Sequence, residues 1–76
     1  MIDVRLFATL PTKSRDGRRI YQVEPREGLT IRDLVEEQGL DPGDIHIAMV
    51  NGLRTGLDTE LSDGDRVGLF PPVGGG

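Results

Sequence analysis

The group with the clearest chemical use in this sequence is the α-carboxylate of its last residue, Gly76. It ends the segment Phe70-Pro71-Pro72-Val73-Gly74-Gly75-Gly76. The two prolines hold φ at about −65° and favour an extended chain, and the three glycines that follow the valine carry no side chains. We therefore expect residues 71–76 to form a thin, flexible tail that can enter a narrow channel of another protein. A terminal glycine also leaves the carboxyl carbon open to attack.

The side chains offer no competing reactive centre. The sequence has no cysteine and one histidine, His46, which argues against disulfides, a structural zinc site and a nucleophile–base pair. We interpret His46 as a structural or surface residue. Asp63 and Asp65 flank a glycine in a pattern more typical of a turn than of a cation site. We therefore expect no metal and no catalytic residue in the enzymatic sense.

Composition narrows the class of protein further. The chain has 76 residues, with 9 Lys and Arg against 13 Asp and Glu, and a formal net charge of −4. This length allows one domain, and an acidic balance argues against a nucleic-acid-binding surface. No apolar run approaches the roughly 20 residues of a membrane span, and the charged Asp3 and Arg5 argue against a signal peptide. We expect a soluble cytoplasmic domain without nucleic-acid or membrane partners.

Basic residues concentrate near the start of the chain, in the segment Lys13–Arg19. We place this segment in a hairpin loop around the turn pair Asp16-Gly17. Two interpretations stay open. The segment is either a solvated turn or a docking point for an acidic partner surface, which would accelerate encounter.

The first half of the chain predicts the elements that hold the tail. Residues 2–8 alternate in character as in a half-buried strand, and residues 19–24 predict a second strand paired with it. The inward positions of the first strand would be Ile2, Val4, Leu6 and Ala8. A helix should begin after the N-cap Thr30 and end at Gly39. Its buried face would consist of Ile31, Leu34 and Val35.

The second half predicts further short strands. We expect strands at residues 45–50 and 66–70, with an irregular stretch between them that is pinned to the core by Leu53, Leu57 and Leu61. The facing of 45–50 is ambiguous, because both of its alternating sets are apolar. A hairpin, one helix and further short strands predict an α+β architecture, with a mixed sheet of four to five strands packed on one main helix.

Two of the three aromatic residues, Phe7 and Phe70, alternate out of phase with the inward residues of their strands. They would then share the outer face of the sheet and form an exposed apolar patch, a common mark of an interaction site. The alternative is that one or both rings lie in the core.

Several segments together resemble the MoaD/ThiS sulfur carriers, which have the ubiquitin-like β-grasp fold. The matching segments are Met1–Ala8, Val50-Asn51-Gly52, Leu61–Val67 and the Phe70–Gly76 tail. The last two are the most specific, and they look most like the small subunit of molybdopterin synthase. The resemblance implies a β-grasp domain at residues 1–70 followed by the tail, residues 71–76. The chain departs from the family pattern in having Gly74 at the variable position before the terminal Gly-Gly.

The resemblance implies a carrier that is not itself an enzyme. A ubiquitin-activating-type partner would use ATP to adenylate the carboxylate of Gly76, and sulfide or a persulfide would then give a thiocarboxylate. This chain lacks a phosphate-binding loop, so ATP would bind the partner. The sulfur would pass to the large subunit of molybdopterin synthase or to another acceptor enzyme. The tail residues Pro71, Pro72, Val73, Gly74 and Gly75 would thread the partner, and the partner-binding residues would be Phe7, Phe70 and Arg66.

Other functions stay open at this point. The sulfur could serve thiamin or another thio-product. The chain could instead be a ubiquitin-like modifier joined through Gly76 to target lysines, in which case Lys13, its only lysine, would be the only linkage site for self-chains. It could also be a non-covalent binding module whose tail has no role, since chain ends are commonly disordered.

Overall fold

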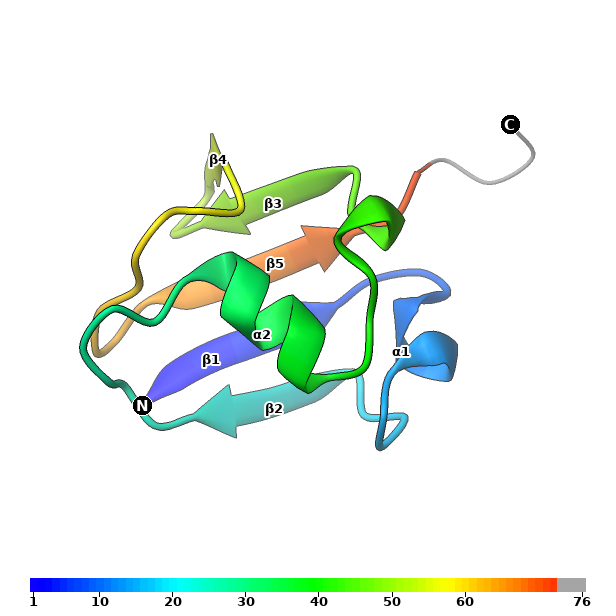
Figure 1. Ribbon diagram of the computed structural model, residues 1–76, viewed down its shortest axis with the longest axis horizontal. Helices are drawn as coiled ribbons and strands as arrows, with labels where there is room; N and C mark the ends of the chain where they lie inside the picture. Colours follow the sequence, from blue (N-terminus) through cyan, green and yellow to red (C-terminus); the bar gives the residue numbers. More distant parts are fainter. Residues whose placement is uncertain (73–76) are drawn as a thin grey trace.

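The computed structural model describes residues 1–72 of this protein as a five-stranded sheet with one main helix, α2, across one of its faces (Figure 1). The elements in chain order are β1 (Ile2–Leu6), α1 (Leu10–Lys13), β2 (Ile20–Val23), α2 (Ile31–Glu37), the 3-10 helix η1 (Pro42–Asp44), β3 (Ile47–Val50), β4 (Leu53–Thr55) and β5 (Arg66–Phe70). The predicted fold class is confirmed. The predicted tail residues Val73, Gly74, Gly75 and Gly76 lie outside the described residues.

The sheet is mixed, with strand order β2-β1-β5-β3-β4. β1 pairs antiparallel with β2 and parallel with β5, whereas β3 pairs antiparallel with both β5 and β4. The parallel pair requires a crossover, and Figure 1 shows α2 lying over the sheet within that connection. The face of the sheet away from α2 is called the outer face below.

Alternation along the strands builds the core between the sheet and α2. Ile2, Val4 and Leu6 are fully buried, as predicted, and so are Ile31 and Val35, with Leu34 1% exposed. The predicted ambiguity of residues 45–50 is resolved, because Ala48 and Val50 turn toward the core. The other buried residues are Leu10, Tyr21, Leu29, Leu40, Leu61, Val67 and Leu69.

α2 begins with a reciprocal cap. The Thr30 hydroxyl accepts a hydrogen bond from the Asp33 N–H at 3.2 Å, and the Asp33 carboxylate accepts one from the Thr30 N–H at 3.0 Å. This capping box satisfies two backbone donors that the first turn leaves free. The backbone and side chain of Thr30 hold the pKa of Asp33 below its usual value. The helix ends at Glu37, and Gly39 follows with a φ of 76°.

The predicted strand 2–8 is wrong at its end. β1 stops at Leu6, and Ala8 is exposed with a φ of 55°, so it cannot continue an extended strand. The short helix α1 follows, which the prediction of a loop from Lys13 missed. Pro11 is tolerated there because the first turn of a helix does not need its N–H, and Leu10 anchors the turn in the core.

Two of the four basic side chains in the segment Lys13–Arg19 form ion pairs within the fold. Arg18 forms an ion pair with Asp16 at 2.9 Å, and Lys13 reaches Asp44 at 3.5 Å. Gly17 has a φ of 71°, as the predicted turn requires. These contacts favour the interpretation as a turn, with Arg15 and Arg19 left without an ion pair among residues 1–72.

The region after α2 differs from the prediction in two further places. β3 begins at Ile47, two positions later than expected, and the stretch predicted to be irregular contains β4. Leu53 does not pin this stretch to the core, because it is 73% exposed, whereas Leu57 packs against the core and Leu61 is buried. The turn between β3 and β4 places Leu53 at the edge of the sheet, beyond the cover of α2.

Candidate functional site

The tail leaves the fold from the centre of the sheet, at the end of β5. Phe70, the last residue of β5, accepts a hydrogen bond at its carbonyl from the His46 N–H at 2.8 Å. One residue earlier, the carbonyl of Leu69 accepts from the Phe7 N–H at 3.0 Å. Pro71 is half-buried and Pro72 is exposed. The chain is therefore held on both sides until the residue before the two prolines.

The rings of Phe7 and Phe70 stack on each other at this exit. Their centroids are 4.2 Å apart and their planes differ by 5°. Both residues are half-buried, so neither ring belongs to the core under α2. Such an aromatic pair contributes about 0.5–1.5 kcal/mol beyond the area that it buries. The stack therefore adds a side-chain restraint to the backbone bonds that fix Phe70.

Gly68 makes room for this stack on the outer face. A Cβ atom at this position would lie 3.3 Å from Cε2 of Phe7 and 3.5 Å from Cε1 of Phe70. The first of these contacts is tighter than side chains normally tolerate, so a larger residue would displace the Phe7 ring. A glycine within a strand often marks such a close approach, and here the approaching groups are the two rings.

The register of the strands brings a row of side chains together beside the rings. Gly68 pairs with Arg5 on one side and with Met49 on the other, and Met49 pairs with Arg54. Paired residues point to the same face of a sheet. A shallow depression of about 240 Å³ lies in this row, and its lining includes Arg5, Phe7, Met49, Arg66, Gly68 and Phe70.

Arg66 is placed by a network that explains two sequence segments of the predicted family resemblance. Asn51, at a φ of 53°, donates its N–H to the Arg66 carbonyl at 2.8 Å and accepts the Arg66 N–H at its side-chain oxygen at 3.0 Å. Its amide nitrogen donates to Asp65 at 3.0 Å, and the second oxygen of Asp65 accepts the Ser62 N–H at 2.8 Å. Asn51 and Asp65 thus have a structural role, because their hydrogen bonds join two turns to β5.

The other aspartate of this turn, Asp63, contacts the N-terminal amine, which lowers the pKa of Asp63. Asp63 and Asp65 therefore serve different partners, as expected of a turn. Residues 1–72 contain no group of three or more side chains suited to hold a metal ion. Within the same residues, no helix has the length and apolar character needed to cross a membrane.

The structure thus brings three predicted partner-binding residues, Phe7, Phe70 and Arg66, to one face of the sheet. Phe7 and Phe70 lie beside the exit of the tail, and Arg66 lies at the other end of β5. Sequence reasoning missed Arg5, Met49 and Gly68, which complete this surface. The signal for Arg5 was its out-of-phase position in the alternating first strand. The signal for Gly68 was a glycine inside a strand, which often indicates that another group approaches the backbone closely.

Comparison with known proteins gives one sequence family and several similar solved structures. The sequence profile described as the ThiS family matches residues 4–76. Among solved structures, the small archaeal modifier protein SAMP1 of Haloferax volcanii is 27% identical with a TM-score of 0.74, and the match covers 99% of this chain and 98% of that one. A proposed molybdopterin converting factor subunit 1 from Pyrococcus furiosus is 33% identical with a TM-score of 0.70, over 95% and 97% of the two chains.

A third structure is a complex of subunits 1 and 2 of the molybdopterin-converting factor from Helicobacter pylori. It matches at 26% identity and a TM-score of 0.58, over 99% of this chain and 97% of that one. The profile match extends through the whole tail, and the resemblance inferred from sequence is confirmed. The chain belongs to the ThiS family, a group of small ubiquitin-like β-grasp proteins that comprises sulfur carriers and protein modifiers.

Proposed function

We propose that this protein is a sulfur carrier for molybdopterin synthesis, with the carboxylate of Gly76 as its attachment point. The observation that carries the proposal is the family match through residue 76 on a fold that anchors the chain up to Phe70. The similarity to a molybdopterin converting factor subunit 1 at 33% identity favours this pathway over thiamin synthesis. The second member of the Helicobacter pylori complex suggests a large-subunit partner.

The chemistry takes place in two steps at the terminal carboxylate. A ubiquitin-activating-type enzyme binds ATP, and the Gly76 carboxylate attacks its α-phosphate, which forms an acyl-adenylate and releases pyrophosphate. Sulfide then attacks the carbonyl carbon, a C–S bond forms, and the C–O bond to AMP breaks. Adenylation is needed because a free carboxylate has a poor leaving group. The sequence without cysteine offers no thiol that could carry the sulfur instead.

The described residues serve this chemistry by presenting the tail. The outer face with Phe7, Phe70 and Arg66 docks on the partner, and the bonds that hold Phe70 define where Pro71 and Pro72 begin. Proline restricts the chain to extended conformations, so the entropy lost when Val73, Gly74, Gly75 and Gly76 enter a channel is limited to the last few residues. In this proposal the chain contributes the Gly76 carboxylate as the nucleophile of adenylation, and the partner enzyme supplies any general acid or base.

Mass spectrometry of the intact chain tests the proposal. The protein is incubated with the adenylating enzyme encoded in the same genome, ATP and sulfide, and we expect one oxygen to be replaced by sulfur. A variant that lacks Gly76 is the matched control and should stay unmodified. If the full chain also stays unmodified, or if deletion of Gly76 leaves molybdopterin synthesis intact in cells, the proposal is wrong.

A modifier function is the second candidate, because SAMP1 covers nearly the whole chain at a TM-score of 0.74. The same activated carboxyl would then form an isopeptide bond with a target lysine and release AMP. Higher-mass adducts that survive reducing denaturing gels and require Gly76 would favour this function. A non-covalent module without a role for the tail would instead keep full partner binding in a chain that ends at Val73.

A further inference from the structure

The outer face carries arginines that the fold leaves without counter-ions. Arg5, Arg54 and Arg66 point to this face, as their pairing with Gly68, Met49 and Asp3 shows. Within residues 1–72, no carboxylate lies within ion-pair distance of these three arginines. Asp3, which faces Arg66 across the strands, accepts a hydrogen bond from Gln22 at 2.8 Å instead. The positive charges of the three arginines are therefore available to the carboxylates of a partner.

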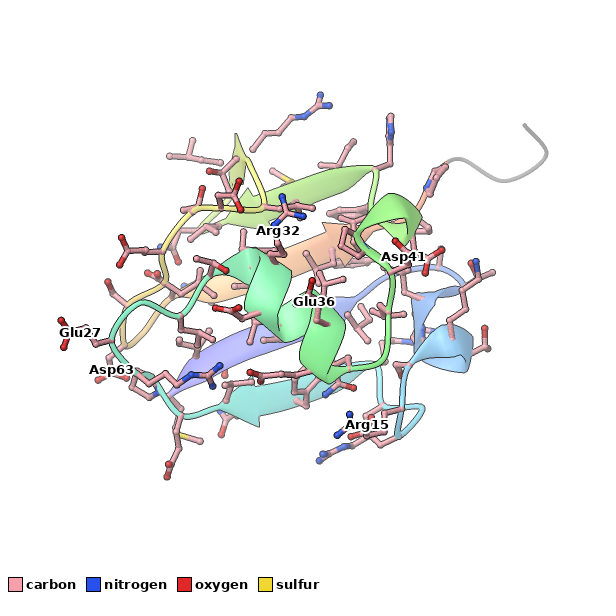
Figure 2. All side chains as sticks on the ribbon, in the orientation of Figure 1. Arg15, Glu27, Arg32, Glu36, Asp41 and Asp63 are labelled. Atoms are coloured by element: carbon pink, nitrogen blue, oxygen red, sulfur yellow. The ribbon has the colours of Figure 1, made fainter. Side chains whose placement is uncertain are left out.

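The helix side has the opposite character. Arg26 is paired with Glu37, and Arg32 with Asp58 at 2.9 Å. Figure 2 shows Glu36 projecting from α2, and Glu27 and Asp41 on the loops that flank it. The strand residues of the outer face comprise three arginines and one aspartate, a net charge of +2, in a chain of net charge −4, so the remaining residues carry −6. The outer face of the sheet is thus more basic than the chain as a whole.

The arginines surround an apolar centre. The stacked rings of Phe7 and Phe70 lie beside Met49 and Ile47, since Ile47 pairs with Phe70 across the strands. Ile20, which pairs with Arg5, is 56% exposed on the same face. Protein interfaces combine such a centre with a polar rim, and aromatic residues, methionine and arginine are enriched in them.

We propose that the outer face docks a protein surface of defined chemistry, an apolar patch bordered by carboxylates that oppose Arg5, Arg54 and Arg66. The inference rests on the proposed function, since it specifies the surface that a partner of the carrier presents. Nucleic acid, which also attracts arginines, is disfavoured because the rest of the chain carries −6. The three arginines steer the acidic partner surface toward this face, from which the tail leaves at the end of β5.

Association kinetics test this inference. The probe is the molybdopterin converting factor subunit 2 encoded in the same genome, and rates are measured by stopped flow at low and high salt. Arg5→Glu, Arg54→Glu and Arg66→Glu should each lower the association rate about three- to tenfold at low salt, and less at high salt, where charges are screened. Arg5→Gln should give an intermediate effect.

Arg15→Glu is the matched control. It makes the same change in net charge and removes no ion pair, and its backbone N–H donates to the Gln38 carbonyl beside the end of α2. Figure 2 shows Arg15 away from the sheet centre. We expect less than about a twofold change in rate for this variant, because steering depends on where a charge lies as well as on net charge.

The outcomes separate this inference from the proposed function. If Gly76 acquires sulfur while the face variants and Arg15→Glu associate at equal rates, the inference is wrong and the proposed function stands. If Gly76 stays unmodified while only the face variants slow association, the proposed function is wrong and the inference stands. Failure of the unmutated chain to bind subunit 2 at all contradicts the inference as well.

Discussion

Substitution of Gly68 by alanine tests whether the Phe7–Phe70 stack rests on the bare backbone of β5. The added methyl group would lie 3.3 Å from Phe7 Cε2, so the Phe7 ring must move by a few tenths of an ångström, whereas its 3.5 Å distance to Phe70 Cε1 is an ordinary contact. The predicted strain therefore falls mainly on Phe7. This asymmetry makes Phe7 the partner to remove in a double-mutant cycle.

The expected magnitudes follow from two opposing effects. Alanine in a strand is favoured over glycine by roughly 0.5–1 kcal/mol, because it restricts the unfolded chain. Displacement of the ring forfeits up to about 0.5–1.5 kcal/mol of stacking. In the unmutated background the two effects nearly cancel, and the free energy of unfolding should change by less than about 1 kcal/mol. In a Phe7→Ala background only the gain of about 0.5–1 kcal/mol remains.

Urea denaturation followed by circular dichroism measures the four free energies of unfolding, with equal m-values as the sign of a common unfolded state. We expect a coupling energy of about 0.5–1.5 kcal/mol between the two positions. Met49→Ala is the control background, because it removes an apolar outer-face side chain that is not among the nearest contacts of a Gly68 methyl group. If Gly68→Ala stabilises all backgrounds by the same amount, the rings do not depend on the glycine.

Three further predictions concern the fold that holds the site. Thr30→Ala removes one half of the capping box and should lower the free energy of unfolding by about 1 kcal/mol in urea titrations. Thr30 lowers the pKa of Asp33 in the folded state. The stabilisation that ionised Asp33 contributes is therefore present above its unfolded pKa of about 3.9 and is lost as pH falls through its pKa in the folded state. Asp33→Asn should therefore flatten the acid side of a stability–pH curve, and an unchanged slope would contradict the cap. Burial raises the pKa of Tyr21, and the negative charges of Asp16 and Glu37 raise it further. The Gln38 carboxamide opposes this shift weakly. Among residues 1–72, the Tyr21 hydroxyl has no hydrogen-bond partner of ordinary geometry. Stability should be complete below the unfolded pKa of about 10 and fall at higher pH, where only the unfolded chain ionises. Tyr21→Phe should abolish that alkaline loss without lowering stability at neutral pH, and the absorbance of this single tyrosine should titrate only with unfolding. Leu34→Ala, in the middle of the buried face of α2, should cost about 2–5 kcal/mol in thermal or urea unfolding, and a cost below about 1 kcal/mol would show that the core is not formed as described.

Patterns within short stretches of sequence were enough to predict β1 and the start of α2. The alternation of Ile2, Val4 and Leu6 predicted β1 and its inward face, and Thr30 with Asp33 predicted the start of α2. The end of β1 could not be predicted, because Phe7 and Ala8 continue the alternation while the backbone turns at the φ of 55° of Ala8. Helix α1 was not predicted, because its four residues, Leu10–Lys13, are too few to show a helical period.

The candidate site was predicted only where alternation alone was enough. Phe7 and Phe70 were placed on the outer face from their phase within single strands. The meeting of Arg5, Gly68, Met49 and Arg54 depends on pairing between strands distant in sequence. Such pairing is fixed by packing of the whole sheet on α2. No short stretch of sequence contains that information, so the arginine-bordered surface emerged from the structure.

We propose that sulfur is carried on the last residue of this chain. The most direct measurement is fragmentation mass spectrometry of the chain after reaction with the adenylating enzyme, ATP and sulfide, which assigns the added mass to a residue. We predict that a single oxygen-to-sulfur exchange is found at Gly76, and that it disappears when the carrier transfers its sulfur. A chain that stays unmodified at Gly76, or that gains mass only as an isopeptide adduct, would contradict the account.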